Sequence, residues 1–207
     1  MKWSIRRATR AAHKFPDNVE QVCEQAGYRM AAAIRDLNMP DGAFLVNMDQ
    51  TQIVYAMGPE GTWNERGVKQ VTVSGKDEKR AFTLCVGVSA SGEALPFQAV
   101  FAGKTDASCP SKKSPFYDTA MQKGFKFVPS GVTGNYWSNQ KTMQLYVSQI
   151  LAPYFERHRK RIGRPKQRCA LQLDCWSVHR SDEFRTWMKK NYPWIILLYV
   201  PGGCTPL

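Results

Sequence analysis

Period-two alternation over residues 81–101 sets the first limit on how this chain can fold. Apolar residues occupy every second position from Phe82 to Val88 and, after the turn SASGE, again from Leu95 to Phe101. This alternation is typical of two antiparallel strands that each bury one face. The pattern therefore predicts a β-hairpin in the first half of the chain.

The second half changes to a longer period. Residues 137–161 carry apolar side chains at spacings of three and four, which predicts a helix with Ser138 as its N-cap and a kink at Pro153. A second helix follows Ser181, its predicted N-cap, and has acidic residues in its first turn. The run WIILLYVP (194–201) then predicts a strand covered on both faces.

Helices that separate late strands imply crossover connections and parallel pairing. Combined with the antiparallel hairpin, they predict an α/β fold: a mixed sheet with helices on both faces. Residues 1–41 form a predicted helical basic arm, and residues 42–207 form the core. Within the core, residues 53–75 suggest a short hairpin and residues 103–136 a long surface insertion.

Two apolar runs are each followed by an aspartate. The segment AFLVNMDQTQ predicts a strand from Ala43 to Met48 that ends at Asp49, and CALQLDCWSVH predicts one that ends at Asp174. Carboxylate oxygens at neighbouring strand ends suit Mg²⁺ or Mn²⁺, which prefer oxygen ligands. The alternative is that both aspartates start turns or cap helices, as aspartate commonly does.

The charge of the chain points to an anionic partner. The formal net charge is +12 and the pI is near 9.6, which favours nucleic acid, although an ordinary basic protein is the alternative. One acid-free stretch stands out as a candidate for DNA phosphate contacts or nuclear import, or else as a solvated helix end. Its cations are Arg157, Arg159, Lys160, Arg161, Arg164, Lys166 and Arg168.

Other residues leave further alternatives open. No apolar segment has the length of a membrane span, so no membrane partner is expected. The scattered cysteines fit a reducing compartment, and the basic N-terminus suits a solvated arm or a transit peptide. Three tryptophans could stack on bases or pack in the core: Trp137, Trp176 and Trp187. A zinc set is disfavoured because its first two members lie about 20 Å apart along a strand: Cys169, Cys175, His179 and Cys204.

Four segments resemble a known family. The stretches VNMDQTQ, YWSNQKTMQLYVSQILAPYF, LDCWSVHRSDEFRTWM and IILLYVPGGCTPL are similar to the transposase core of the pogo-like DDE superfamily, which includes the domain related to centromere protein B. The resemblance covers roughly residues 43–207. It implies a ribonuclease H-like fold, metal-assisted cleavage and joining of DNA, and a nuclear location.

The resemblance also assigns roles to individual residues. Asp49 and Asp174 match the first and second catalytic aspartates, and His179 matches a histidine that positions phosphate or water, or alternatively caps a helix. The third acid of the family is expected beyond Leu207, and Gln50 stands where many members have glutamate.

These departures favour a fragment, or a decayed or domesticated copy with weakened chemistry. The alternative is a non-catalytic nucleic-acid-binding protein. Self-association stays open.

Overall fold

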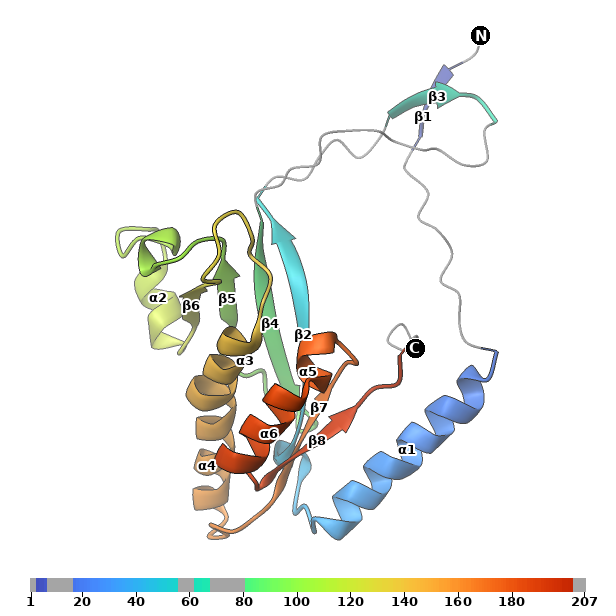
Figure 1. The fold of residues 1–207 in the computed structure, drawn as a ribbon, viewed down its shortest axis with the longest axis vertical. Helices are drawn as coiled ribbons and strands as arrows, with labels where there is room; N and C mark the ends of the chain where they lie inside the picture. The colour runs from blue at the N-terminus through green and yellow to red at the C-terminus, as the bar shows by residue number, and fades with distance from the viewer. Residues whose placement is uncertain (1–2, 7–16, 56–61, 68–80, 203–207) are drawn as a thin grey trace.

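The computed structural model describes residues 3–6, 17–55, 62–67 and 81–202. Its body is a six-stranded sheet in the order β6-β5-β4-β2-β7-β8, and a second sheet pairs β1 with β3 (Figure 1). The strands are β1 Trp3–Arg6, β2 Leu45–Val54, β3 Thr62–Glu65, β4 Ala81–Ser89, β5 Gln98–Phe101, β6 Lys126–Pro129, β7 Cys169–Leu173 and β8 Ile195–Tyr199. The α-helices are α1 Val19–Asp36, α2 Tyr117–Gln122, α3 Gln140–Tyr146, α4 Ala152–Arg161, α5 Ser177–Arg180 and α6 Asp182–Asn191.

Antiparallel and parallel pairs meet at the centre of the large sheet. β2 and β4 pair antiparallel from Val46↔Ser89 to Val54↔Ala81, and β4 pairs antiparallel with β5. β7 joins β2 in parallel, and β8 joins β7 in parallel. The predicted mixed sheet and the predicted hairpin are therefore confirmed, although the return strand of the hairpin is limited to β5.

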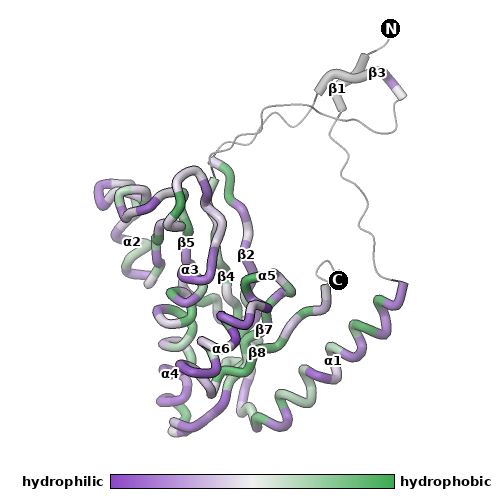
Figure 2. Tube along the Cα trace, in the orientation of Figure 1, coloured by the Kyte–Doolittle hydropathy of each residue, from purple (hydrophilic) through white to green (hydrophobic). Residues whose placement is uncertain are grey.

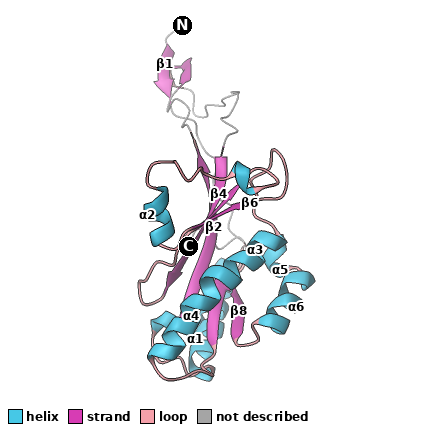
Figure 3. Ribbon diagram, turned by 90° about the vertical axis from the view of Figure 1, so that its left-hand side faces the viewer, coloured by secondary structure: helices cyan, strands magenta, loops and turns pink. Residues whose placement is uncertain are grey.

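Helices lie on both faces of this sheet. Figure 3 shows α2 on one side and α3, α5 and α6 on the other. Alternate residues of the strands, among them Met48 and Leu171, are fully buried against Phe155 of α4 and Phe184 of α6. This cluster is the hydrophobic core, and it holds the central strands rigidly in place.

The longest helical stretch begins one residue later than predicted. Asn139, not Ser138, is the N-cap: its side chain accepts from the Thr142 N–H, and the Thr142 hydroxyl accepts in turn from the Asn139 N–H. Ser138 is buried and shares a hydrogen bond with the Thr142 hydroxyl instead. α3 continues into α4 through a π-helical turn at Val147–Leu151, just before Pro153. Proline has no N–H to donate, so a widened turn suits this position.

Three further predictions are changed by the structure. β2 does not end before Asp49 but continues to Val54, because β4 supplies a partner along that whole length. The predicted surface insertion contains α2 and also the edge strand β6, which pairs in parallel with β5. β8 is an edge strand whose residues beyond Ile195 are only half-buried. The predicted strand arm VKQVTVSG lies outside the described residues.

The N-terminal helix α1 lies along β8 (Figure 1). It starts directly after Asn18, and none of its residues is buried. Figure 2 shows hydrophobic and hydrophilic residues mixed along it. Cys23 and Met30 of α1, together with Leu198 and Val200, line a hollow of about 440 Å³ between the helix and the sheet. The helix therefore covers this edge of the sheet without joining the core.

Candidate metal centre and nucleic-acid interface

The register of the central strands brings the two aspartates together. β2 and β7 pair in parallel from Leu45↔Ala170 to Asn47↔Gln172. Asp49 lies two residues beyond Asn47, and Asp174 lies two residues beyond Gln172. Continued by two residues, this register pairs Asp49 with Asp174, just beyond the last residue of β7.

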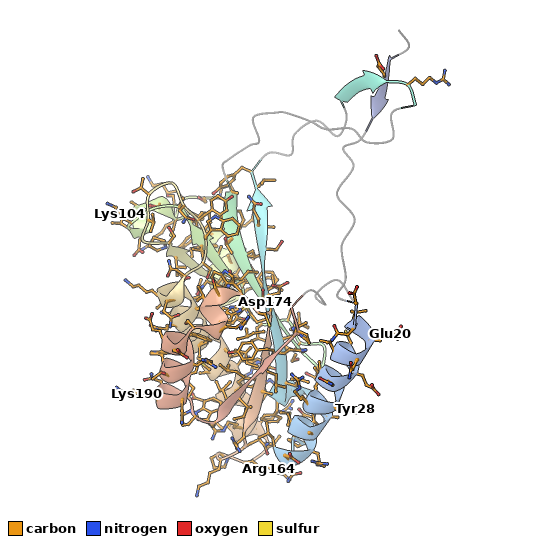
Figure 4. The ribbon with its side chains drawn as sticks, turned by 45° about the vertical axis from the view of Figure 1, so that its right-hand side comes forward. Glu20, Tyr28, Lys104, Arg164, Asp174 and Lys190 are labelled. Atoms are coloured by element: carbon orange, nitrogen blue, oxygen red, sulfur yellow. The ribbon has the colours of Figure 1, made fainter. Side chains whose placement is uncertain are left out.

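Both carboxylates are open to solvent. Asp49 is exposed on β2, and the Asp174 side chain is 33 % exposed. One oxygen of Asp49 accepts from the Gln50 N–H at 2.7 Å. Figure 4 shows Asp174 near the middle of the molecule, at the end of the strand that leads to α5. An ion could therefore approach the two side chains from solvent.

His179 holds one side of this pair. Its Nδ1 lies 2.7 Å from Asp174 Oδ1, and because a carboxylate only accepts, the Nδ1–H of the histidine donates. The ring is buried, at 1 % exposure, and packs against Trp176 and Phe184. The Tyr199 hydroxyl donates to the His179 carbonyl at 2.8 Å. This packing fixes one Asp174 oxygen and turns the histidine ring away from solvent.

Electrostatics agrees with this arrangement. Burial lowers the pKa of His179, and the hydrogen bond and charge of Asp174, with a smaller contribution from Asp49, act in the opposite direction. Burial dominates, so the imidazole is neutral near pH 7 and keeps its single proton on Nδ1.

The donor set suits a hard divalent cation. Mg²⁺ is commonly held by one or two carboxylates, with waters and substrate phosphates completing its shell. Asp49 and Asp174 supply such oxygens, and Asn47 and Thr51 are exposed on the same face of β2 as Asp49. Within the described ranges, no group of three or more His, Cys, Asp or Glu residues could hold a metal ion.

The structure does not gather the four residues of the disfavoured zinc set into one site. Cys169 is buried at the start of β7, and Cys175 donates its thiol to the Val200 carbonyl at 3.0 Å. His179 is bonded to Asp174, and Cys204 lies outside the described residues.

The basic segment lies at the other end of β7. Arg168 directly precedes β7 and Asp174 directly follows it, so about 20 Å of strand separates the two positions at roughly 3.3 Å per residue. Figure 4 shows Arg164 and Asp174 well apart, with the strand between them. The structure therefore does not bring the predicted phosphate-binding residues and the predicted metal ligands into one site.

Some cations of the basic segment already have partners. Arg157 pairs with Glu93, and Arg161 pairs with Asp41 at 2.9 Å. The Arg159 guanidinium lies over the Trp194 ring, 4.3 Å from its centre. The remaining four cations are exposed and form no ion pair with a described residue: Lys160, Arg164, Lys166 and Arg168. These four are free to meet an anionic ligand.

The residues that support the pair carry no functional signal in the sequence. Tyr199 and Phe184 belong to apolar patterns that only predict burial, and nothing local links either one to His179. Trp176, one of the three candidate base-stacking residues, packs edge-on against the histidine, whereas Trp137 is 59 % exposed. Among the described residues, no helix is long and apolar enough to cross a membrane.

The long strand β2 has β4, β5 and β6 on one side, and β4 pairs antiparallel with both β2 and β5. On its other side lie the parallel strands β7 and β8, and this arrangement is an α/β fold of the ribonuclease H-like kind. Solved structures of the Mos1 mariner transposase share this fold. The catalytic domain of that transposase matches with a TM-score of 0.52 and 11 % identity, over 93 % of this chain and 66 % of the other.

Two complexes of the same transposase also match. A paired-end complex with the left transposon end has a TM-score of 0.52 and 11 % identity, over 97 % of this chain. A paired-end complex with Mn has a TM-score of 0.53 and 12 % identity, over 98 % of this chain. The chain spans 48 % of the length of the transposase in each complex. At such identities the likeness establishes the fold.

No family model matches the chain, and no curated protein matches it either.

Proposed function

We propose that this chain is a DNA-binding domain derived from a DDE transposase of the pogo-like group, in which Asp49 and Asp174 together bind Mg²⁺ or Mn²⁺. The observation that carries the proposal is the shared register of β2 and β7, which ends two residues before each aspartate and, when continued, pairs Asp49 with Asp174. The transposase-like fold and the sequence resemblance support it. The nucleus is the location that such a function requires.

The two aspartates and the histidine have different parts in the proposal. Asp49 and Asp174 supply the oxygens that hold the ion, and His179 keeps Asp174 in position through its Nδ1–H. When bound, a divalent ion polarises a phosphodiester and lowers the pKa of a coordinated water. Because the ring of His179 is buried, its proposed role is to position the carboxylate, as outer-shell partners do.

Metal titration tests the proposal directly. Asp49→Asn and Asp174→Asn should each weaken Mn²⁺ binding by at least about tenfold, because the remaining carboxylate alone must hold the ion. Calorimetric titration of the purified protein measures this affinity. Asp182→Asn is a matched control, since Asp182 is a 92 % exposed aspartate on α6 that pairs with Arg185. Equal affinities for all four proteins would contradict the proposed ligands.

A second candidate function is a non-catalytic nucleic-acid-binding module. It is favoured by the distance between the four free cations and the carboxylates, since DNA held at the basic end of β7 does not need the aspartates. The two functions differ in a nicking assay with supercoiled DNA and Mn²⁺. Nicking that disappears in Asp49→Asn and Asp174→Asn supports the enzyme, and tight binding without nicking supports the module.

A further inference from the structure

An aromatic hollow opens on the same face of the sheet as Asp49. It has a volume of about 700 Å³ and lies between the strands β4, β5 and β6 and the segment 103–127. Half of the residues that line it are aromatic, among them Tyr55, Phe82, Phe101, Phe116, Tyr117 and Phe125. Cavities of this size that are lined by aromatic side chains and a few polar groups are typical ligand sites.

Two of these rings are held out in solvent. Phe116 is 83 % exposed and Tyr55 is 58 % exposed. Phe116 also has a left-handed backbone, with φ of 61°, which bulky side chains rarely adopt. An exposed aromatic surface of this kind usually marks an interaction site. The chain therefore presents two rings at the mouth of the hollow that its own core does not use.

The rim of the hollow is positively charged. Segment 103–127 contains five lysines against two aspartates. Lys112 and Lys113 stand between the lining residues Pro110 and Ser114, and no lysine of the segment pairs with an acid among the described residues. A second copy of this chain would bring the same positive excess, so the complementary partner is an anion with flat, apolar faces. Nucleobases on a phosphate backbone have this chemistry.

The hollow is joined to the candidate metal centre along β2. Thr51 pairs with Leu84 and Ile53 with Phe82, and both of these β4 residues line the hollow. Asp49, Thr51, Ile53 and Tyr55 alternate on one exposed face. This face spans about 20 Å from Asp49 to Tyr55 at roughly 3.3 Å per residue. That length corresponds to roughly six stacked nucleotides at about 3.4 Å each.

We infer that the aromatic hollow binds unpaired nucleotides of single-stranded DNA, with bases stacked on Phe116 and Tyr55 and phosphates beside Lys112 and Lys113. The inference deepens the proposed function and rests on it, because it names the form of DNA held next to the aspartates. Stacking on aromatic rings beside a basic rim is tolerant of sequence, so the site takes most base sequences.

Fluorescence anisotropy tests the inference. The probes are a labelled oligothymidylate of about ten nucleotides, within the usual site size, and a labelled blunt duplex of the same length. Measurements in EDTA remove any contribution from metal at Asp49 and Asp174. Phe116→Ala should weaken oligothymidylate binding by about 5- to 150-fold, the range expected for loss of one stacked base, and should leave duplex binding unchanged. Tyr28→Ala is the matched control, because Tyr28 is a 66 % exposed ring on α1.

Photocrosslinking adds a second measurement. Oligonucleotides that carry 5-iodouracil should crosslink within segment 103–127 or at Tyr55, and the crosslink should disappear under competing oligothymidylate. Equal losses for single strand and duplex in Phe116→Ala, crosslinks confined to other segments, or equally strong competition by polyglutamate would each overturn the inference. Loss of metal binding in Asp49→Asn leaves these measurements untouched, so failure of the proposed metal site and failure of the hollow are told apart.

Discussion

At the scale of single residues, the pairing of Asp174 with His179 decides how the candidate site is built. A neutral, buried imidazole donates to one carboxylate oxygen and leaves the other oxygen available. Trp176 and Phe184 prevent the ring from turning. The negative charge that would attract an ion is therefore carried by Asp174, and His179 fixes the position of its carboxylate.

Loss of the histidine should loosen the carboxylate. His179→Ala should weaken Mn²⁺ binding by roughly tenfold or more, because outer-shell partners typically contribute 10- to 100-fold to metal affinity. His179→Gln should recover part of this, since an amide N–H can still donate to Asp174. Calorimetric titration measures both variants. His158→Ala is the control: His158 is also buried but bonds Glu93 at 3.1 Å, so its loss should lower stability and leave metal affinity unchanged.

Cysteine reactivity gives a second prediction at this scale. Burial raises the pKa of the Cys85 and Cys169 thiols to about 12. In the folded protein both should resist a thiol reagent at pH 8.5, whereas the partly exposed Cys23 and Cys109 should react. Labelling followed by peptide mass spectrometry measures this, and labelling in urea is the control.

The same thiols set a limit on stability at high pH. A raised folded pKa means that the unfolded chain releases these protons first, near pH 9. The contribution of these two thiols to the free energy of unfolding is therefore fully present below about pH 9. It falls as the pH rises from there towards 12. Labelling of Cys85 in the native protein as fast as in urea would contradict the burial.

At the scale of elements, the sequence predicts which helices and strands exist better than it predicts where each one begins and ends. Alternation and helical spacing correctly predict the hairpin, the helix 140–161 and the strand before Asp174, since each buries a regular stripe of side chains. β2 extends past Asp49 because a distant strand pairs with it, and local residues carry no sign of that partner. β6 escapes prediction for the same reason: its few residues become a strand only beside β5.

The cap of the long helix can be tested. Asn139→Ala removes the acceptor for the Thr142 N–H and should lower the free energy of unfolding by about 0.5–2 kcal/mol. Asn139→Asp keeps the acceptor for the Thr142 N–H but loses the bond that the Asn139 amide donates to the Ser130 carbonyl, so it should recover only part of the loss. Urea unfolding followed by circular dichroism measures both. A loss in Asn139→Asp as large as in Asn139→Ala would show that the cap bond is not the cause.

At the scale of the whole molecule, the exposed cations of the basic segment, the two aspartates and the aromatic hollow lie in different places. The four free cations lie before β7, the aspartates lie at its far end, and the aromatic hollow lies beyond them towards α2. The net charge of the chain predicts an anionic partner. Composition does not say where charges lie in the fold. It could not predict that three cations of the basic segment contact other residues of the chain.

The salt dependence of DNA binding tests this layout. Replacing Lys160, Arg164, Lys166 and Arg168 with glutamine should weaken duplex binding and flatten its dependence on salt, by about 0.9 in slope for each phosphate that is no longer neutralised. Arg161→Gln is the control, because Arg161 already pairs with Asp41 and should change the slope little. Anisotropy across a salt series measures both. An unchanged slope in the fourfold variant would mean that the DNA phosphates bind to other residues.

The π-helical turn between α3 and α4 has a consequence for insertions and deletions. A π-turn holds one residue more than an α-turn. Because the extra residue is taken up within Val147–Leu151, the buried faces of α3 and α4 point to the same side. Removing one residue there, with Pro153→Ala to restore the missing N–H, would give an unbroken α-helix with Phe155 still facing the core. The same deletion anywhere else in the helix would rotate everything after it by about 100°. Relatives that differ by one residue in helix length are therefore expected to differ at this turn.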